Sequence, residues 1–272
     1  FLITMERLTE VVFEVSIDRS GLDTIVIPKA SEIKFRGRGI ELQSLLKSYR
    51  TLPDKLQFEP GITLILGENA SGKTVLCDAL SIIAKLAWAR SYDGGDEQSN
   101  EFASYIRSRG DSVQARNPQQ VLSFQIARAL RVDRIQTSGR EFIRRSNIPL
   151  FDISGLQAHR AMTSYSNLDK IGELTPQILQ DFNSHRQTLD RCFDDLKKAA
   201  IQNPNAGIYF FDEPEIGMSP RRHKTIETEI LDCAPPHSIV IVATNSVLFF
   251  DSSLPRIDLD FPERGIHQPN HD

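Results

Sequence analysis

Eight consecutive residues, 67–74, combine glycines, a lysine and a threonine at the spacing G-x-x-x-x-G-K-[ST]. Glycines let the backbone curl around an anion, so that its N–H groups can point at phosphate oxygens. Lys73 would bring positive charge to the β- and γ-phosphates, and the Thr74 hydroxyl would be a ligand for Mg²⁺. The segment therefore predicts a loop that binds a nucleoside triphosphate. Its predicted contacts are Gly67, Glu68, Asn69, Ala70, Ser71, Gly72, Lys73, Thr74 and Val75.

Two carboxylates near the end of the chain could complete this chemistry. The apolar run 207–211 ends in Asp212 and Glu213, and a second glutamate, Glu215, follows Pro214. Ligands of open α/β sheets bind at the carboxyl ends of the strands, which is where these acids would lie. We expect Asp212 to hold Mg²⁺ and Glu213 to accept a proton from the attacking water, with Glu215 as the alternative base.

The segments around these residues have the patterns of elements that could position them. Residues 62–66 are apolar and β-branched, which predicts a buried strand, and residues 75–86 predict a buried helix directly after the loop. A further buried strand is expected over 238–244 and ends beside Asn245. Helices are predicted over 175–200 and 221–232.

The rest of the chain predicts an antiparallel β layer and two less regular stretches. In the β layer, before the phosphate loop, strands are expected over 11–17 and 24–27, with a turn at Ser20 and Gly21, and over 33–40. A second set of antiparallel strands is expected over 121–126 and 132–143, with a turn at Ser138 and Gly139. Residues 41–60 are expected to form a connection with one short helix. A polar linker is expected over 93–100, and residues 102–106 are compatible with a short helix.

Composition limits the kind of protein. The chain has 272 residues, a hydrophobic fraction of 40% and a formal net charge of −4, so it predicts a globular protein without an overall basic field for nucleic acid. Its three cysteines are too few and too scattered for a disulfide framework, which indicates a cytoplasmic protein. Apolar runs long enough to span a membrane are absent. Residues 1–4 precede Met5, and the expected domain begins at Met5.

The two motifs together resemble those of the ABC-type ATPases, in particular the small SMC/RecF-like branch of stand-alone ATPase heads. The resemblance covers residues 58–88 and 180–250, where Asp212 to Glu215 and residues 216–220 are similar to the Walker B motif and D-loop. It implies an α/β P-loop NTPase with a mostly parallel core sheet, an antiparallel β layer and a helical lobe. Asn245 stands where the family has a switch histidine, and an asparagine cannot become cationic.

The family's signature and lobe glutamine are placed by the same resemblance. Ser184, at the start of Ser-His-Arg-Gln, is the candidate signature residue, although Arg186 replaces the expected glycine. A plain helix capping box explains the same pattern, and the rival at 138–141 reads better as a hairpin turn. Gln157 is the candidate Mg²⁺-sensing glutamine and Gln125 the alternative, while a surface glutamine is an equally good explanation for either.

The resemblance implies a single ATPase domain over 5–272. Its expected parts are a β layer with the phosphate loop (5–90), a linker and signature lobe (91–200), the Walker B and switch strands (201–250) and a C-terminal tail (251–272). It implies ATP and Mg²⁺ as cofactors, Lys73, Glu213 and Asn245 as catalytic residues, and an ATP-dependent head-to-tail dimer. It also implies an unidentified effector protein, with DNA as a further possible ligand, in DNA repair or antiviral defence. The alternatives are a weakly hydrolysing binding module that holds an effector and, less favoured, the motor subunit of a membrane transporter.

Overall fold

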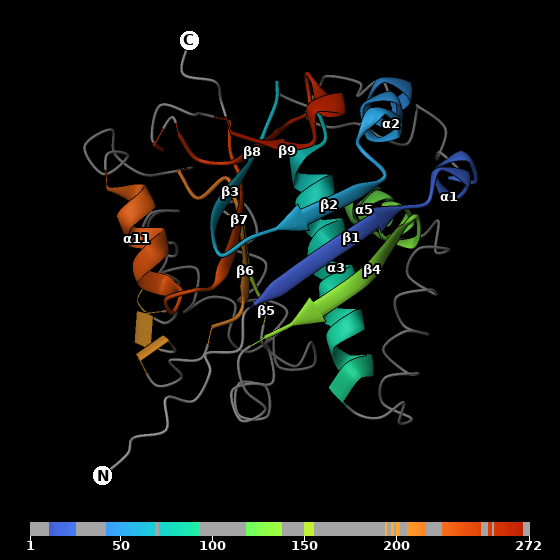
Figure 1. Cartoon of the computed structure of the whole chain (residues 1–272). Helices are drawn as coiled ribbons and strands as arrows, with labels where there is room; N and C mark the ends of the chain where they lie inside the picture. The colour runs from blue at the N-terminus through green and yellow to red at the C-terminus, as the bar shows by residue number, and fades with distance from the viewer. Residues whose placement is uncertain are drawn as a thin grey trace, which may run out of the picture.

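Two β-sheets and the helices packed on them make up the described part of the chain (Figure 1). The structure is a computed structural model of the whole sequence. It describes residues 11–25, 42–68, 71–92, 118–137, 150–154, 206–215, 225–245, 250, 251 and 253–268, and the single positions 194, 197, 198, 200 and 201.

A six-stranded sheet carries the segments that hold the predicted site. Its strand order is β5-β6-β7-β3-β8-β9, and every neighbouring pair except β8 and β9 is parallel. The strands are β3 (Gly61–Leu66), β5 (Leu150–Ser154), β6 (Ile208–Asp212), β7 (Ile239–Ala243), β8 (Arg256–Asp258) and β9 (Ile266–His267). The predicted mostly parallel core sheet is confirmed, with strands where the runs 62–66, 207–211 and 238–244 indicated them.

In β3, β6 and β7 both faces are buried, which explains why these three strands are apolar without alternation. In β7, Ile239 and Ile241 belong to one core cluster, whereas Val240 and Val242 belong to another. The first cluster includes residues of α3 (Lys73–Tyr92) and of the second sheet, and the second includes residues of α11 (Ile226–Cys233). Figure 1 shows α3 and α11 on opposite sides of the parallel strands.

The second sheet is antiparallel and has the order β2-β1-β4, so an antiparallel layer is present, but of the strands predicted before the phosphate loop it contains only the one over 11–17. Its strands are β1 (Val12–Ile17), β2 (Lys55–Phe58) and β4 (Leu130–Gln136). The Phe13 ring stacks on Phe58 with centroids 5.3 Å apart, and it meets the edge of Phe210 from β6 at 6.4 Å. Phe13 therefore joins the two sheets in one core.

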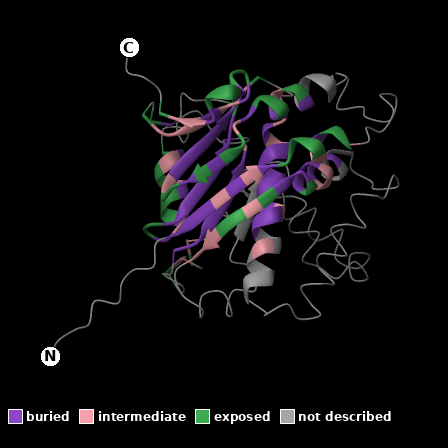
Figure 2. Cartoon of the chain, turned by 45° about the vertical axis from the view of Figure 1, so that its right-hand side comes forward, coloured by how far each residue is buried: buried purple, intermediate pink, exposed green. Residues whose placement is uncertain are grey.

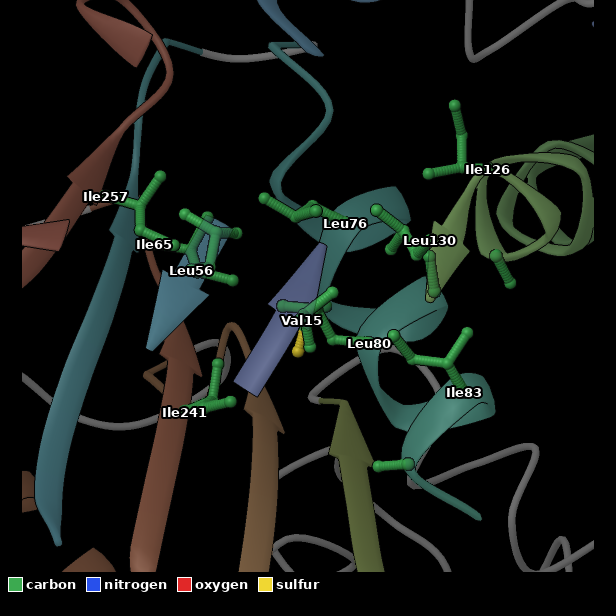
Figure 3. Packing of buried hydrophobic residues seen from close by; sticks show 14 of the residues in the cluster. Val15, Leu56, Ile65, Leu76, Leu80, Ile83, Ile126, Leu130, Ile241 and Ile257 are labelled. Atoms are coloured by element: carbon green, nitrogen blue, oxygen red, sulfur yellow. The ribbon is translucent and has the colours of Figure 1, made fainter. Parts of the chain in front are cut away.

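That core is filled by side chains from several elements distant in sequence. Figure 3 shows Val15, Leu56, Leu80 and Ile241 converging from β1, β2, α3 and β7. Figure 2 shows buried residues along the strands of both sheets and along α3. Burial of this apolar area supplies the main stabilisation of the framework that carries the site.

The predicted strand over 121–126 is wrong, because these residues belong to the helix α5 (Pro118–Arg128). Leu122 and Ile126 are buried four residues apart, the spacing of one helix face, and Ala129 and Leu130 continue the buried side after the helix ends. A short apolar run is compatible with either element, and only its packing partner decides between them. Here the partner is α3, against which α5 packs.

The predicted turn at 20–21 is also wrong, because Ser20 and Gly21 lie in a short helix, α1 (Arg19–Asp23). Asp18 caps this helix by accepting a hydrogen bond from the Ser20 backbone N–H at 3.0 Å. Thr24 ends the helix, so the expected strand does not begin there. Residues 26 and 27 of that predicted strand lie outside the described residues.

Several elements were not expected from the sequence. The connection 41–60 contains the predicted short helix, α2 (Leu42–Thr51), but also the strand β2. Residues 256–267, assigned to a C-terminal tail, form β8, the short 3₁₀-helix η3 (Pro262–Arg264) and β9. The strand β5 pairs with β6 at the edge of the parallel sheet.

Other predictions lie wholly or largely outside the described residues. They concern residues 33–40, 93–106, 138–143 and most of the helix over 175–200, of which positions 194, 197, 198 and 200 are described as helical. The predicted helical lobe is therefore untested. Within the described residues, none of the helices is both long and apolar enough to cross a membrane.

Candidate nucleotide-binding site

The glycine-rich segment connects β3 to α3, as the motif requires. β3 ends at Leu66 and α3 begins at Lys73. Gly67 has φ +148° and Gly72 has φ +99°, backbone conformations that residues other than glycine rarely adopt. The first turn of α3 presents backbone N–H groups and the positive end of the helix dipole at this point. Asn69 and Ala70 lie outside the described residues.

Lys73 is buried inside this loop. Its Nζ atom donates hydrogen bonds to the carbonyl oxygens of Gly67 and Glu68, each at 2.8 Å. Burial lowers the pKa of Lys73 from its usual value, and the nearby charges of Glu213 and Asp212 act in the opposite direction. The loop therefore holds a cation beside the acids of the second motif, although the two motifs are far apart in sequence.

Thr74 and Asp212 are in direct contact. The Thr74 hydroxyl donates to Asp212 Oδ1 at 3.0 Å, and Asp212 is itself buried. Strand alternation explains the contact, because Asp212 has the same parity in β6 as Phe210, which packs in the core cluster on the α3 side. The second residue of α3 thus faces the last residue of β6.

This pair of oxygens fits a magnesium ion. Mg²⁺ prefers hard oxygen ligands at about 2.0–2.1 Å in an octahedron, whose neighbouring ligands are about 2.9 Å apart. The Thr74–Asp212 spacing of 3.0 Å agrees with this. Magnesium in phosphate sites usually takes one or two protein ligands and completes its shell with phosphate and water. Accordingly, the described residues contain no cluster of three or more His, Cys, Asp or Glu side chains suited to a metal.

Glu213 follows directly after β6 and has an unusual backbone. Its φ is +47°, in the left-handed region, and its N–H donates to the Ala243 carbonyl at 2.7 Å. A non-glycine residue in this region is strained, and such strain clusters at functional sites. The Asn245 side-chain amide donates to Glu213 Oε1. The predicted base Glu213 and Asn245, the residue predicted at the switch position, are therefore neighbours.

Two further residues of the site were missed by sequence reasoning. The Tyr49 hydroxyl of α2 donates to the Gly72 carbonyl at 2.7 Å, and Asp260 accepts from the Glu68 N–H at 3.3 Å. Tyr49 has no local signal that would have identified it. Asp260 lies two residues after β8. The apolar residues Ile257 and Leu259, two positions apart, form a strand pattern that could have located this segment.

The structure brings together some predicted site residues and leaves others undescribed. Lys73, Thr74, Asp212, Glu213 and Asn245 gather at the carboxyl ends of β3, β6 and β7. Val75 is buried in the first turn of α3. Ser184, Arg186 and Gln157 lie outside the described residues. Gln125, the alternative to Gln157, lies on α5, which packs against α3 and β4.

A comparison with protein-family models found one match, described as an AAA domain, over residues 44–213. This range includes the phosphate loop and ends at Glu213, and it is more than half of the chain. The chain belongs to the AAA domain family. It is therefore a P-loop protein of the nucleotide-binding ATPase class. No curated protein and no solved structure was found to match the chain.

In this AAA domain we expect Gly67→Ala to destabilise the folded chain and weaken ATP binding. A Cβ at position 67 would lie 2.5 Å from Ser71 Oγ and 3.2 Å from Leu259 Cβ, in addition to the strain of the positive φ. The expected loss is about 1–3 kcal/mol in the free energy of unfolding, measured by urea denaturation.

Gly61→Ala is the matched control for this change. Gly61 also has a positive φ, +112°, but its Cβ would meet nothing within 4 Å. It should therefore report the backbone strain alone. Equal losses in the two variants would show that the Ser71 and Leu259 contacts do not constrain the loop.

Proposed function

We propose that this AAA domain binds ATP with Mg²⁺ and hydrolyses it at the site formed by the phosphate loop and the end of β6. The observation that carries the proposal is the Thr74–Asp212 contact at 3.0 Å, with Lys73 buried in the adjacent loop. It unites the metal-binding and phosphate-binding parts of the two motifs. Family membership supports the same chemistry at the general level of a P-loop ATPase.

Each side chain has a chemical role in this proposal. Lys73 would exchange its loop carbonyl partners for phosphate oxygens and stabilise the charge that develops on the transferred group. Thr74 and Asp212 would hold Mg²⁺, which neutralises phosphate charge when bound. Glu213 would orient the attacking water and accept its proton, because a carboxylate at the strand end faces the same space as the loop. Phosphoryl transfer needs mainly this positioning and electrostatic stabilisation.

The proposal extends to assembly. A signature at Ser184 would act on the γ-phosphate held by Lys73 of a second copy, so we propose an ATP-dependent head-to-tail dimer. A work-performing ATPase of this kind would drive or gate an effector protein, in DNA repair or antiviral defence. Support for this step comes from the motif resemblance alone. Sedimentation with and without ATP–Mg²⁺ measures the dimer directly.

Turnover by the purified chain tests the central proposal. ATP–Mg²⁺ should bind in isothermal titration, and ADP should accumulate in a chromatographic assay when Mg²⁺ is present. Addition of EDTA in excess should stop the reaction, because Thr74 and Asp212 then have no metal to position. The assay is run with and without DNA, which separates a basal activity from a DNA-stimulated one. Absence of ATP binding would refute the proposal.

A second candidate function is a nucleotide-gated module that hydrolyses ATP weakly. Asn245 favours it, because its neutral amide occupies the position where related ATPases have a histidine and contacts Glu213. Under this alternative, ATP binds with the same dependence on Lys73, and the bound nucleotide stays ATP over many minutes. The same titration and ADP assay therefore distinguish the two functions.

A further inference from the structure

Glu215 is a buried carboxylate beside the site that the proposed reaction does not use. Only 7% of its surface is exposed. Its Oε1 atom accepts two hydrogen bonds, from the Thr244 hydroxyl at 2.6 Å and from the Asn245 backbone N–H at 3.0 Å. Its Oε2 atom is buried and has no hydrogen-bond partner within the described part of the chain.

A glutamate is costly at this position. Burial raises the pKa of Glu215 because the charged form loses its hydration, and the two hydrogen-bond donors oppose this only in part. The neighbouring charge of Glu213 also disfavours ionisation of Glu215. An apolar side chain of similar size would fill the same space without these costs. What the glutamate adds is the acceptor atom Oε1.

The contacts of that atom lead to the predicted base. β7 ends at Ala243, and the next residue, Thr244, donates its N–H to the Ile65 carbonyl of β3 at 3.1 Å. Asn245 follows directly after Thr244, and its backbone N–H donates to Glu215 Oε1. The Asn245 side chain in turn donates to Glu213 Oε1. Glu215, Asn245 and Glu213 thus form one continuous chain of contacts.

We propose that Glu215 is a positioning residue that fixes Asn245, so that the Asn245 amide holds the Glu213 carboxylate in the orientation needed to accept a proton. The inference rests on the proposed ATP hydrolysis. With one Glu213 oxygen bound by Asn245, the other is left to face the attacking water. The backbone of Glu213 lies in the left-handed region. A strained residue keeps its conformation only when contacts from its surroundings fix it, so Glu213 needs such contacts from other residues.

Two substitutions distinguish the effect of losing the hydrogen-bond acceptor Oε1 from the effects of losing the charge and of losing packed volume. Glu215→Gln keeps a carbonyl oxygen that can accept both hydrogen bonds, whereas Glu215→Leu keeps the volume without an acceptor. We expect Glu215→Leu to lower kcat about tenfold or more with the Kd for ATP–Mg²⁺ within about threefold, as expected when a catalytic group is misplaced. Glu215→Gln should retain kcat within about threefold.

Glu227→Leu is the matched control. Glu227 is a partly buried glutamate of α11 that accepts from the Asp251 backbone N–H at 2.8 Å, so it loses the same kind of bond away from the site. Its kcat should equal that of the wild type. A loss of kcat of about tenfold or more in Glu215→Gln would overturn the proposal, because the charge rather than the acceptor would then matter. This arm decides the question even if Glu215→Leu does not fold.

A double-mutant comparison tests whether Glu215 acts through Asn245. In an Asn245→Ala background, Glu215→Leu should change kcat by less than about twofold, because the link is already broken. A loss as large as in the wild-type background would overturn the proposal.

The link can also be measured without catalysis, by NMR of protein labelled with ¹⁵N-asparagine. The Asn245 side-chain resonance, assigned by its loss in Asn245→Ala, should shift in Glu215→Leu and stay in place in Glu215→Gln. An unchanged resonance in Glu215→Leu would overturn the proposal, because Glu215 would then not position the Asn245 side chain. Failure of ATP turnover in the wild type would instead refute the proposed function, and the NMR result would remain interpretable.

Discussion

Lys73→Ala is expected to remove ATP binding while leaving the fold intact. The ammonium donates to two loop carbonyls, and in the complex it would donate to phosphate oxygens instead. Hydrogen bonds between charged groups contribute about 1.5–3 kcal/mol each, so losing two weakens binding by about 100-fold or more. Isothermal titration with ATP–Mg²⁺ measures this loss directly.

Two further variants show whether the effect comes from charge. Lys73→Met keeps the apolar stem and should lose binding as completely as Lys73→Ala. Its melting temperature without nucleotide measures what the charge contributes to the fold, because burial disfavours the cation whereas the two loop carbonyls and the charges of Glu213 and Asp212 favour it. Lys55 is an exposed lysine on β2, and the control variant Lys55→Ala should bind ATP like the wild type. A Kd within threefold of the wild type in Lys73→Met would refute the loop assignment.

Glu213→Gln is expected to keep ATP binding and stop turnover. A glutamine can still accept from the Asn245 amide, so the local contacts remain, but it cannot take a proton from water. Loss of a general base costs about 10²–10⁴ in rate, which single-turnover ADP formation measures. The ATP-bound dimer proposed above should accumulate in this variant and be visible by light scattering.

Glu59→Gln serves as the control for this prediction. Glu59 is an exposed glutamate between β2 and β3, and its change should leave turnover unaltered. If Glu213→Gln hydrolyses ATP at the wild-type rate, Glu213 is not the base. Glu215 would then be the carboxylate to test, although its burial limits its contact with an attacking water.

The parts of the site that chemistry ties to a fixed spacing could be predicted from the sequence. The loop needs glycines, Lys73 and Thr74 at set positions, and the carboxylates must follow a buried strand, so both motifs were recognisable. Thr74 and Asp212 were each predicted as a Mg²⁺ ligand, and their direct contact at 3.0 Å is a finding of the structure.

Contacts made across the fold could not be predicted in this way. Tyr49 reaches Gly72 from 23 residues away, and Asp260 reaches Glu68 from 192 residues away. No local pattern encodes such contacts, because they depend on how elements pack. The same reason explains the error at 121–126, where helix and strand bury a short apolar run equally well and α3 decides.

The place of β3 in its sheet determines when the phosphate loop can form during protein synthesis. β3 lies between β7 and β8, and both are made long after it. At about 5–20 residues per second, the roughly 190 residues between Leu66 and Arg256 take about 10–40 seconds. Until β7 is made both edges of β3 lack their partners, and the edge that pairs with β8 lacks its partner throughout this interval, a condition that favours aggregation. On the proposed function, we expect ATP to stabilise this chain only once translation has passed β8, so that the growing chain must keep β3 protected without it.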